Sequence, residues 1–141
     1  MDFKKIIEAA KIPALLLIGL TSVVAVLGFV GLNLGIISLP IQFVILGFAG
    51  YNAVKAFKFD LINGALTGAV ASFFSMIATI IGNIIFTITG VIPWEAVSTQ
   101  IGVSTETVML FAIIGYILGL LLSPIIGFIF GIIGAFIAQK T

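Results

Sequence analysis

One stretch of the chain decides its fold class. Residues 105–138 read TETVMLFAIIGYILGLLLSPIIGFIFGIIGAFIA, and Glu106 is the only charged residue among them. Three further stretches are similarly apolar: 12–34, 39–57 and 61–90. A helix needs about 20 mostly apolar residues to cross a hydrocarbon core of about 30 Å. The sequence therefore predicts an all-α, polytopic membrane protein with four transmembrane helices in one compact bundle, a single domain over 1–141.

The composition supports this class. Of the residues, 62% are hydrophobic and 8% charged, whereas a soluble domain carries about 25% charged residues. The apolar stretches lack the two-residue alternation of barrel strands. The net charge of +1 gives no basic footprint for nucleic acid. The chain has no cysteine and no histidine, so we expect no disulfide, metal site or cofactor, and the lipid bilayer is the first expected partner.

The charged residues predict an orientation. The six lysines lie before the first stretch, at the junction of the second and third, or after the fourth: Lys4, Lys5, Lys11, Lys55, Lys58 and Lys140. The connection 91–104 contains Glu95 and no lysine. Short loops that carry lysine remain cytoplasmic. We therefore expect both termini in the cytoplasm and 91–104 as an outer loop.

The first eleven residues form a separate amphipathic pattern. Phe3, Ile6, Ile7 and Ala10 share one helical face. We expect residues 1–11 to lie along the inner membrane surface, with Pro13 opening the first transmembrane helix. A cleaved signal peptide is the alternative, but its apolar region would have only about 7–15 residues. A retained first helix is favoured.

Helix-start residues define the outer loop and two of the spans. Pro93 begins a short interfacial helix that ends near Gly102, with Trp94 at the level of the lipid headgroups. Ser104 is expected to cap the fourth transmembrane helix, and Asp60 the third.

Small residues recur every four positions in the last two helices, as in a glycine zipper. The rows are Gly115, Gly119, Ser123, Gly127 and Gly131 in the fourth helix, and Gly64 and Gly68 in the third. Helices in lipid pack through small residues that admit close backbone approach. A four-residue step turns by about 40° on a helix of about 3.6 residues per turn, so each row spirals. We therefore expect each of these helices to contact at least two neighbours.

Two Gly-x-x-Gly pairs occupy equivalent places before a lysine. They are Gly47 with Gly50, before Lys55, and Gly131 with Gly134, before Lys140. An internal duplication of a helical hairpin would explain them. Biased composition also generates such echoes, and this second explanation is favoured.

The fourth stretch is longer than a bilayer requires and contains Pro124. Proline removes a backbone donor inside a helix, so a kink is expected there. A gating hinge, as in the broken helices of transporters, is one interpretation. A static kink that lets a long helix follow its neighbours is the favoured one.

Polar side chains gather in the half of the spans that faces outside in this topology: Asn33, Gln42, Thr79, Asn83 and Thr87. They could form a small polar pocket open to the outside. Interhelical hydrogen bonds, worth about 0.6 kcal/mol each on average, are the favoured alternative. The phenol of Tyr116 faces the same choice.

The interior of the spans offers no ionisable side chain for catalysis or proton transfer. No Asp, Glu, Lys, Arg or His lies deep in any of them. Proton relays and ion-coupled transporters place ionisable groups there, and acid–base catalysis needs a paired acid and base. We therefore expect that the protein is not an enzyme.

Two short segments carry a family resemblance. Gly47-Phe-Ala-Gly50-Tyr51 and Asn63-Gly-Ala-Leu-Thr-Gly68-Ala resemble the centre of small, uncharacterised four-helix membrane proteins found in archaea. The glycine-rich end, 127–138, is similar to theirs, whereas the long outer loop and Pro124 depart from the pattern. The resemblance implies an archaeal plasma membrane and leaves the function open.

Two classes of function remain. The first is a structural or accessory membrane protein that packs helices alone, as a homo-oligomer or in a larger complex. The alternative is a small oligomeric channel or solute facilitator. A channel should have a polar face along at least one helix. Only the third helix offers one, and it spirals, so the first class is favoured.

Overall fold

The computed structural model describes residues 2–29, 32 and 34–141. It contains five helices: α1 (Phe3–Phe29), α2 (Gly35–Phe57), α3 (Leu61–Ile88), α4 (Trp94–Ile101) and α5 (Thr105–Lys140). No strand occurs among the described residues. Helices α1, α2, α3 and α5 are each long and apolar enough to cross a membrane. The predicted all-α class with four helices of membrane length is confirmed.

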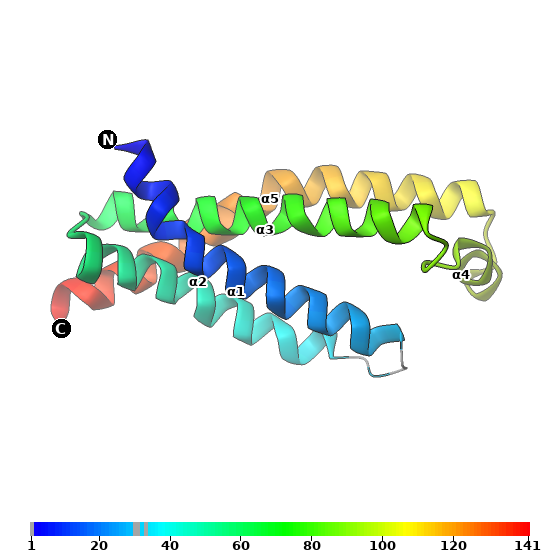
Figure 1. Ribbon diagram of the computed structural model, residues 1–141, viewed down its shortest axis with the longest axis horizontal. Helices are drawn as coiled ribbons and strands as arrows, with labels where there is room; N and C mark the ends of the chain where they lie inside the picture. The colour runs from blue at the N-terminus through cyan, green and yellow to red at the C-terminus, as the bar shows by residue number, and fades with distance from the viewer. Residues whose placement is uncertain (1, 30–31, 33) are drawn as a thin grey trace.

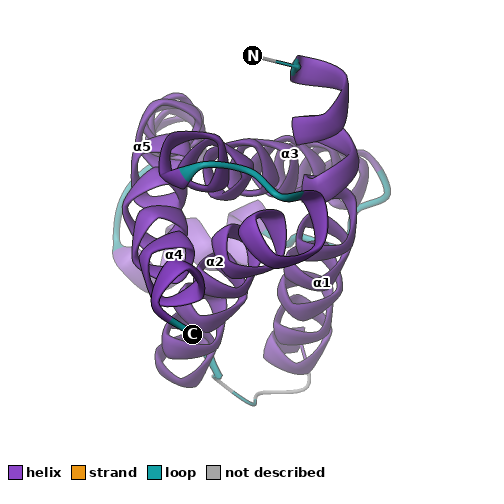
Figure 2. Cartoon of the chain, turned by 90° about the vertical axis from the view of Figure 1, so that its left-hand side faces the viewer, coloured by secondary structure: helices purple, strands orange, loops and turns teal. Residues whose placement is uncertain are grey.

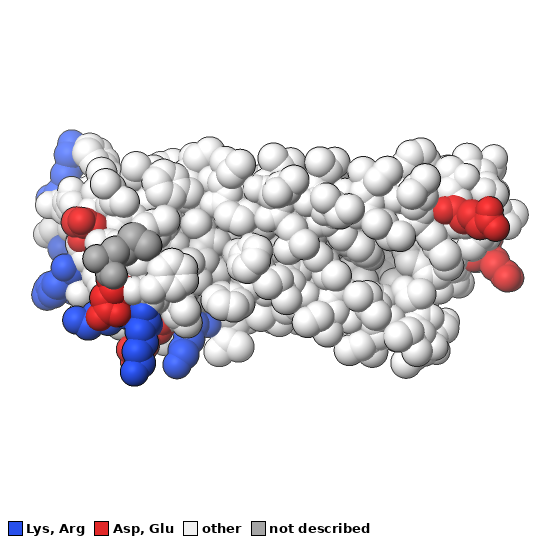
Figure 3. All heavy atoms as spheres, turned by 90° about the horizontal axis from the view of Figure 1, so that it is seen from above, with Lys and Arg blue, Asp and Glu red and all other residues white. Residues whose placement is uncertain are grey.

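The four long helices run along the long axis of the molecule (Figure 1). Both termini lie at one end, and α4 lies at the other. Lysine side chains gather at the first of these ends, as Figure 3 shows. Glu95 in α4 and Glu106 in the first turn of α5 lie at the opposite end. The two ends are called the lysine end and the α4 end below.

The two predicted helix caps and the short outer helix are found in place. Asp60 Oδ1 accepts the backbone N–H of Asn63 at 2.8 Å, and Ser104 Oγ accepts that of Thr107 at 3.3 Å. The short helix predicted between Pro93 and Gly102 is α4, and Gly102 ends it in the left-handed region with φ 77°. These features depend on a few neighbouring residues, and the local rules predicted them correctly.

The first helix differs from its prediction. α1 is one continuous helix from Phe3 through Pro13, whereas a separate segment 1–11 and a new helix start were expected. Pro13 leaves the carbonyl of Ala9 without its usual helical donor, and the first part of α1 lies at an angle to the remainder (Figures 1 and 2). Ile6 and Ala10 are buried against the bundle. The segment is therefore a bent extension of the transmembrane helix.

Other boundaries shift by a few residues. α2 begins at Gly35 and contains Pro40, where 39–57 was expected. α3 ends at Ile88, two residues before its predicted limit, and α5 continues to Lys140, two residues beyond its own. The predicted end of the first span, at 34, follows residues 30, 31 and 33, which lie outside the described residues.

Helices α3 and α5 hold the bundle together. α3 contacts α1, α2 and α5, and α5 contacts α2, α3 and α4, so each has at least two neighbours as expected. α5 remains helical through Pro124. It lies beside α3 near the α4 end and crosses behind it toward α2 at the lysine end (Figure 1). The long fifth helix thus changes partners along its length.

Candidate functional site

The closest helix contacts of the molecule lie at the lysine end, where α2, α3 and α5 meet through glycines. A Cβ atom built on Gly134 would overlap the carbonyl oxygen of Gly47, and one built on Gly50 would overlap that of Gly131. These contacts join α2 to α5. Only glycine permits them, because in each case the obstacle is backbone.

The contact between α3 and α5 is of the same kind. A Cβ built on Gly68 would overlap the carbonyl oxygen of Gly127, and one built on Gly127 would overlap that of Gly68. A Cβ on Gly131 would lie 2.8 Å from the carbonyl oxygen of Ala65. Gly131 therefore faces both α2 and α3.

The predicted row on α5 has different surroundings along its length. Gly127 and Gly131 lie against the backbone of other helices, whereas the atoms nearest to a Cβ on Gly119 belong to the flexible side chain of Met76. A Cβ on Gly115 would meet nothing within 4 Å. Ser123 lies between these groups, and its Oγ is buried without a hydrogen-bond partner.

The predicted row on α3 lies wholly within the packed region. A Cβ on Gly64 would lie 2.7 Å from the Cβ of Ala135 on α5 and 3.3 Å from the carbonyl oxygen of Gly50 on α2. Gly68 contacts α5 as described above. The sequence did not assign Gly50 and Gly134 to an interface, although their Gly-x-x-Gly pairs were a signal that could have identified them.

Packing becomes looser toward the α4 end. A Cβ would meet nothing within 4 Å at Gly19, Gly28, Gly82 or Gly115. The main buried cluster lies away from this end: Ala10, Ala14, Leu17, Leu46 and Ala71. Figure 1 shows the pair α1 and α2 diverging from α3 and α5 in the direction of the α4 end. The helices therefore interlock at one end and separate at the other.

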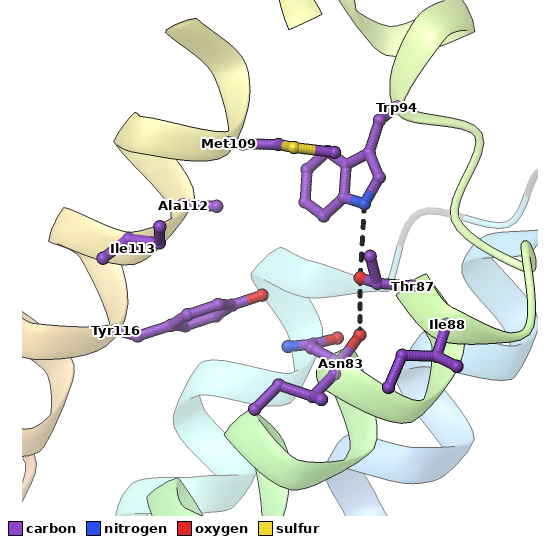
Figure 4. A pocket seen from close by; sticks show the side chains of 9 residues that line it. Asn83, Thr87, Ile88, Trp94, Met109, Ala112, Ile113 and Tyr116 are labelled. Carbon is purple, nitrogen blue, oxygen red and sulfur yellow. Dashed lines mark hydrogen bonds between the residues drawn. The ribbon is translucent and has the colours of Figure 1, made fainter. Parts of the chain in front are cut away.

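A cavity of about 210 Å³ lies between α3, α4 and α5 at the α4 end (Figure 4). Trp94 Nε1 donates to Thr87 Oγ1 at 3.2 Å, and that hydroxyl donates to the backbone oxygen of Asn83 at 2.8 Å. Tyr116 reaches toward the same space from α5. The remaining lining is apolar: Ile84, Ile88, Met109, Ala112 and Ile113.

This cavity opens sideways. Ile88 and Ile113, which line it, are 80% and 54% exposed. In a chain that crosses a membrane, such faces meet lipid chains or another helix. α4 packs against α5, and the hydrogen bond from the Trp94 indole to Thr87 links it to the end of α3. The cavity is therefore an apolar recess with a few polar groups at its edge.

A smaller cavity of about 90 Å³ lies between α1 and α3, and Thr21, Ser22, Thr79 and Asn83 contribute its polar lining. Each hydroxyl is bonded within its own helix. Thr21 Oγ1 donates to the carbonyl of Leu17 at 3.0 Å, Ser22 Oγ to that of Ile18 at 2.8 Å, and Thr79 Oγ1 to that of Ser75 at 3.0 Å. Such bonds satisfy a buried hydroxyl without a neighbour.

The five polar residues of the predicted pocket are therefore not in one place. Asn83 lines both cavities, Thr87 the larger and Thr79 the smaller. Gln42 is half-buried on α2 and lines neither of them. Asn33 lies outside the described residues.

For Thr79 and Thr87, hydrogen bonds within α3 take the place of the expected interhelical ones. The hydroxyls of Thr79 and Thr87 donate to carbonyls of α3 itself. The bond from Trp94 to Thr87 joins α4 to α3, a short interfacial helix to a long one. Buried Thr67, in the packed region of α3, also donates to the carbonyl four residues earlier, that of Asn63, at 2.9 Å, so this bond is a local property of the helix.

Comparison with known proteins identifies no family for the chain. The chain matches no protein-family model, and no curated protein or solved structure matches it.

Proposed function

We propose that the protein is a multi-pass membrane protein without catalytic apparatus, whose role is structural: its interlocked lysine end holds the bundle together, and its uncovered helix faces at the α4 end pack against a second copy of the chain. Assembly into a larger membrane complex is a variant of the same role. The proposal concerns helix packing and assigns no reaction or transported solute.

The contrast between the two sets of glycines carries this proposal. Gly50, Gly68 and Gly134 permit backbone contacts that no other residue would allow. Gly28 and Gly115 are exposed, and among the described residues a Cβ on either would meet nothing within 4 Å, yet each costs about 1 kcal/mol of helix propensity relative to alanine. Small residues in membrane helices serve close association. Their unfilled surroundings are what a partner helix would occupy.

The charge distribution supports a plasma-membrane protein with both termini in the cytoplasm. Lysines and termini share one end of the molecule (Figures 1 and 3), and lysine-rich short loops remain on the cytoplasmic side. The resemblance to archaeal four-helix membrane proteins is consistent with this location.

Orientation is tested by labelling intact cells with an impermeant thiol reagent. Ser98, in the middle of α4, is unsuitable as a labelling site because it is 7% exposed and bonded to the carbonyl of Glu95 and the hydroxyl of Thr105. Gln100 is exposed, so Gln100→Cys should be labelled from outside, and a cysteine added after Thr141 should not. If only the terminal cysteine were labelled, the chain would have the opposite orientation in the membrane.

Self-association is tested by disulfide crosslinking in liposomes, since the natural chain has no cysteine. Gly115→Cys should crosslink two copies, and Ile117→Cys should crosslink poorly. Both positions are exposed on α5 at similar depth, but two residues of helix place them on nearly opposite faces. Native mass measurement should give an oligomer. A monomer by mass, with equally poor crosslinking at both positions, would refute the proposal.

A small oligomeric channel or facilitator is the second candidate, because Asn83, Thr87 and Tyr116 surround the larger cavity. The Thr87 hydroxyl is already bonded on both sides, and the rest of the lining is apolar, which favours the structural role. If the channel role holds, Asn83→Leu should reduce solute flux in liposomes while preserving the mass of the assembly.

A further inference from the structure

A second apolar recess, at the lysine end, has a cation at its edge. It lies between α1 and α3, encloses about 290 Å³ and is lined by Ile7, Lys11, Ala14, Leu15 and Phe74. The four residues from α1 fall at the spacing of a single helical face. Lys11 contributes the only charged group.

We propose that this recess binds an anionic phospholipid, with the lipid phosphate on the ammonium group of Lys11 and the upper part of a lipid hydrocarbon chain against Leu15 and Phe74. The inference depends on the chain lying in a membrane and is independent of the proposed packing role.

The charge of Lys11 is available for such a ligand. Its ammonium has no carboxylate within 4.0 Å among the described residues, where the ion pair is Lys5 with Asp2 at 3.8 Å. Glu8 is the acid closest to Lys11 in sequence, and it is exposed and forms no ion pair with it. Asp60 is engaged as the cap of α3. The six lysines at this end exceed its three acids, Asp2, Glu8 and Asp60.

The bend of α1 gives the recess its shape. Ile7 and Lys11 precede Pro13, and Ala14 and Leu15 follow it. The part of α1 before the bend lies at an angle to the part after it (Figure 1). The charged side chain thus comes from the angled segment and the apolar lining continues into the span. A phospholipid has the same order of groups, an anionic headgroup followed by an apolar chain.

A lipid fits this recess better than a second copy of the chain. Leu15 is 67% exposed, so an apolar surface must meet it, and both occupants would supply one. A second copy in the same orientation would bring its own lysine end to this depth (Figure 3), and like charges would repel. Anionic lipids of the cytoplasmic leaflet attract basic residues, with about 1 kcal/mol for each lysine near the surface.

The alternative is that Lys11 simply extends to the headgroup region. Long side chains near helix ends do this without binding a particular lipid. A specific site must distinguish Lys11 from the other lysines of the same end. Lipid binding at a specific site must also depend on the apolar lining, whereas attraction of a lipid to a solvated lysine would not depend on it.

The test uses the full-length protein in mild detergent, with native mass spectrometry after addition of phosphatidylglycerol or of zwitterionic phosphatidylcholine. We expect one phosphatidylglycerol to be retained per chain in preference to phosphatidylcholine. Lys11→Gln should weaken retention about fivefold, which corresponds to about 1 kcal/mol, and Lys11→Arg should restore it. Lys58→Gln makes the same charge change at an exposed position outside the recess and should have little effect.

Phe74→Ala tests the apolar part, because it removes a half-exposed ring without altering any charge. It should weaken phosphatidylglycerol retention while circular dichroism shows unchanged helicity. Equal loss in Lys11→Gln and Lys58→Gln would reduce the effect to general surface charge and overturn the site. Displacement of the lipid by an equal concentration of inorganic phosphate would show that the ligand is a free anion, and would also overturn it.

Discussion

Replacing Gly134 by alanine adds one methyl group to α5 at the place where α2 crosses it. An ideal Cβ at this position would overlap the carbonyl oxygen of Gly47 and lie 3.0 Å from its Cα. Both atoms belong to the backbone, so no change of rotamer relieves the overlap. The two helices must move apart, which also loosens the neighbouring contact between Gly50 and Gly131.

The expected cost follows from two opposing effects. Overpacking of an interior by extra methyl groups costs about 1–3 kcal/mol, and the upper part of this range applies because the obstacle is backbone. Alanine is a better helix former than glycine by about 1 kcal/mol, which offsets part of the loss. We therefore expect Gly134→Ala to lower the free energy of unfolding by about 2 kcal/mol.

Gly115→Ala is the matched control, since it makes the same change in the same helix, and no described atom of another helix lies within 4 Å of the new Cβ. It should leave the free energy of unfolding unchanged or raise it by up to about 1 kcal/mol. Both variants are compared in detergent, at a dilution that keeps the chain monomeric, by following helicity during titration with a denaturing detergent. Identical midpoints for the two variants would refute the close approach of α2 and α5.

Three further outcomes are expected. Gly131→Leu should lower the free energy of unfolding by several kcal/mol, of which overpacking alone is about 1–3 kcal/mol. Ile133→Leu, at a 47% exposed position, should change it by under about 0.5 kcal/mol. Equal unfolding midpoints for the two variants would contradict this. Ser123→Ala removes a buried hydroxyl without a partner and should stabilise the protein by about 1 kcal/mol in the same titration, and a loss would show that the hydroxyl has one. Cysteines at Ser75, which is buried, and Thr79 should stay unreactive toward water-soluble thiol reagents in the folded protein. Fast labelling at both would favour the channel role.

The class of the protein and several helix ends follow from short-range rules. Membrane-length helices need only a long apolar stretch, which the chain provides four times. The caps at Asp60 and Ser104, and the end of α4 at Gly102, each depend on residues within one turn. Such features do not require knowledge of which helices are neighbours, and this is why the sequence predicts them.

The course of α1 shows where a local rule fails. Proline is tolerated in the first turn of a helix and is costly inside one, so Pro13 was expected to start a helix. Burial of Ile6 and Ala10 against the bundle stabilises the preceding residues as helix. Tertiary packing of this kind outweighs the cost of one missing backbone hydrogen bond. The sequence cannot show it, because the contacting surface comes from other helices.

The row of small residues on α5 shows a second limit. Its regular spacing gave Gly115 and Gly131 the same expected role. Gly131 lies against α2 and α3, whereas a Cβ on Gly115 would meet no other helix within 4 Å in the described part of the chain. A row of small residues indicates which face of one helix admits close approach. It does not indicate how far along that face another helix extends. That depends on the crossing of two helices, which involves residues far apart in the chain.

A further difference concerns the two ends of the bundle. The helices diverge toward the α4 end (Figure 1), and the cavity beside α4 and the one between α1 and α3 open there. The sequence does not contain this asymmetry, since it places small residues along both halves of the spans. Gly28 and Gly115 are exposed, with nothing within 4 Å of an added Cβ, so they have the composition of a packing surface without the packing. Inside a membrane such a surface meets lipid chains or another helix, and small residues favour close association of helices, which is the physical basis for proposing a partner at this end.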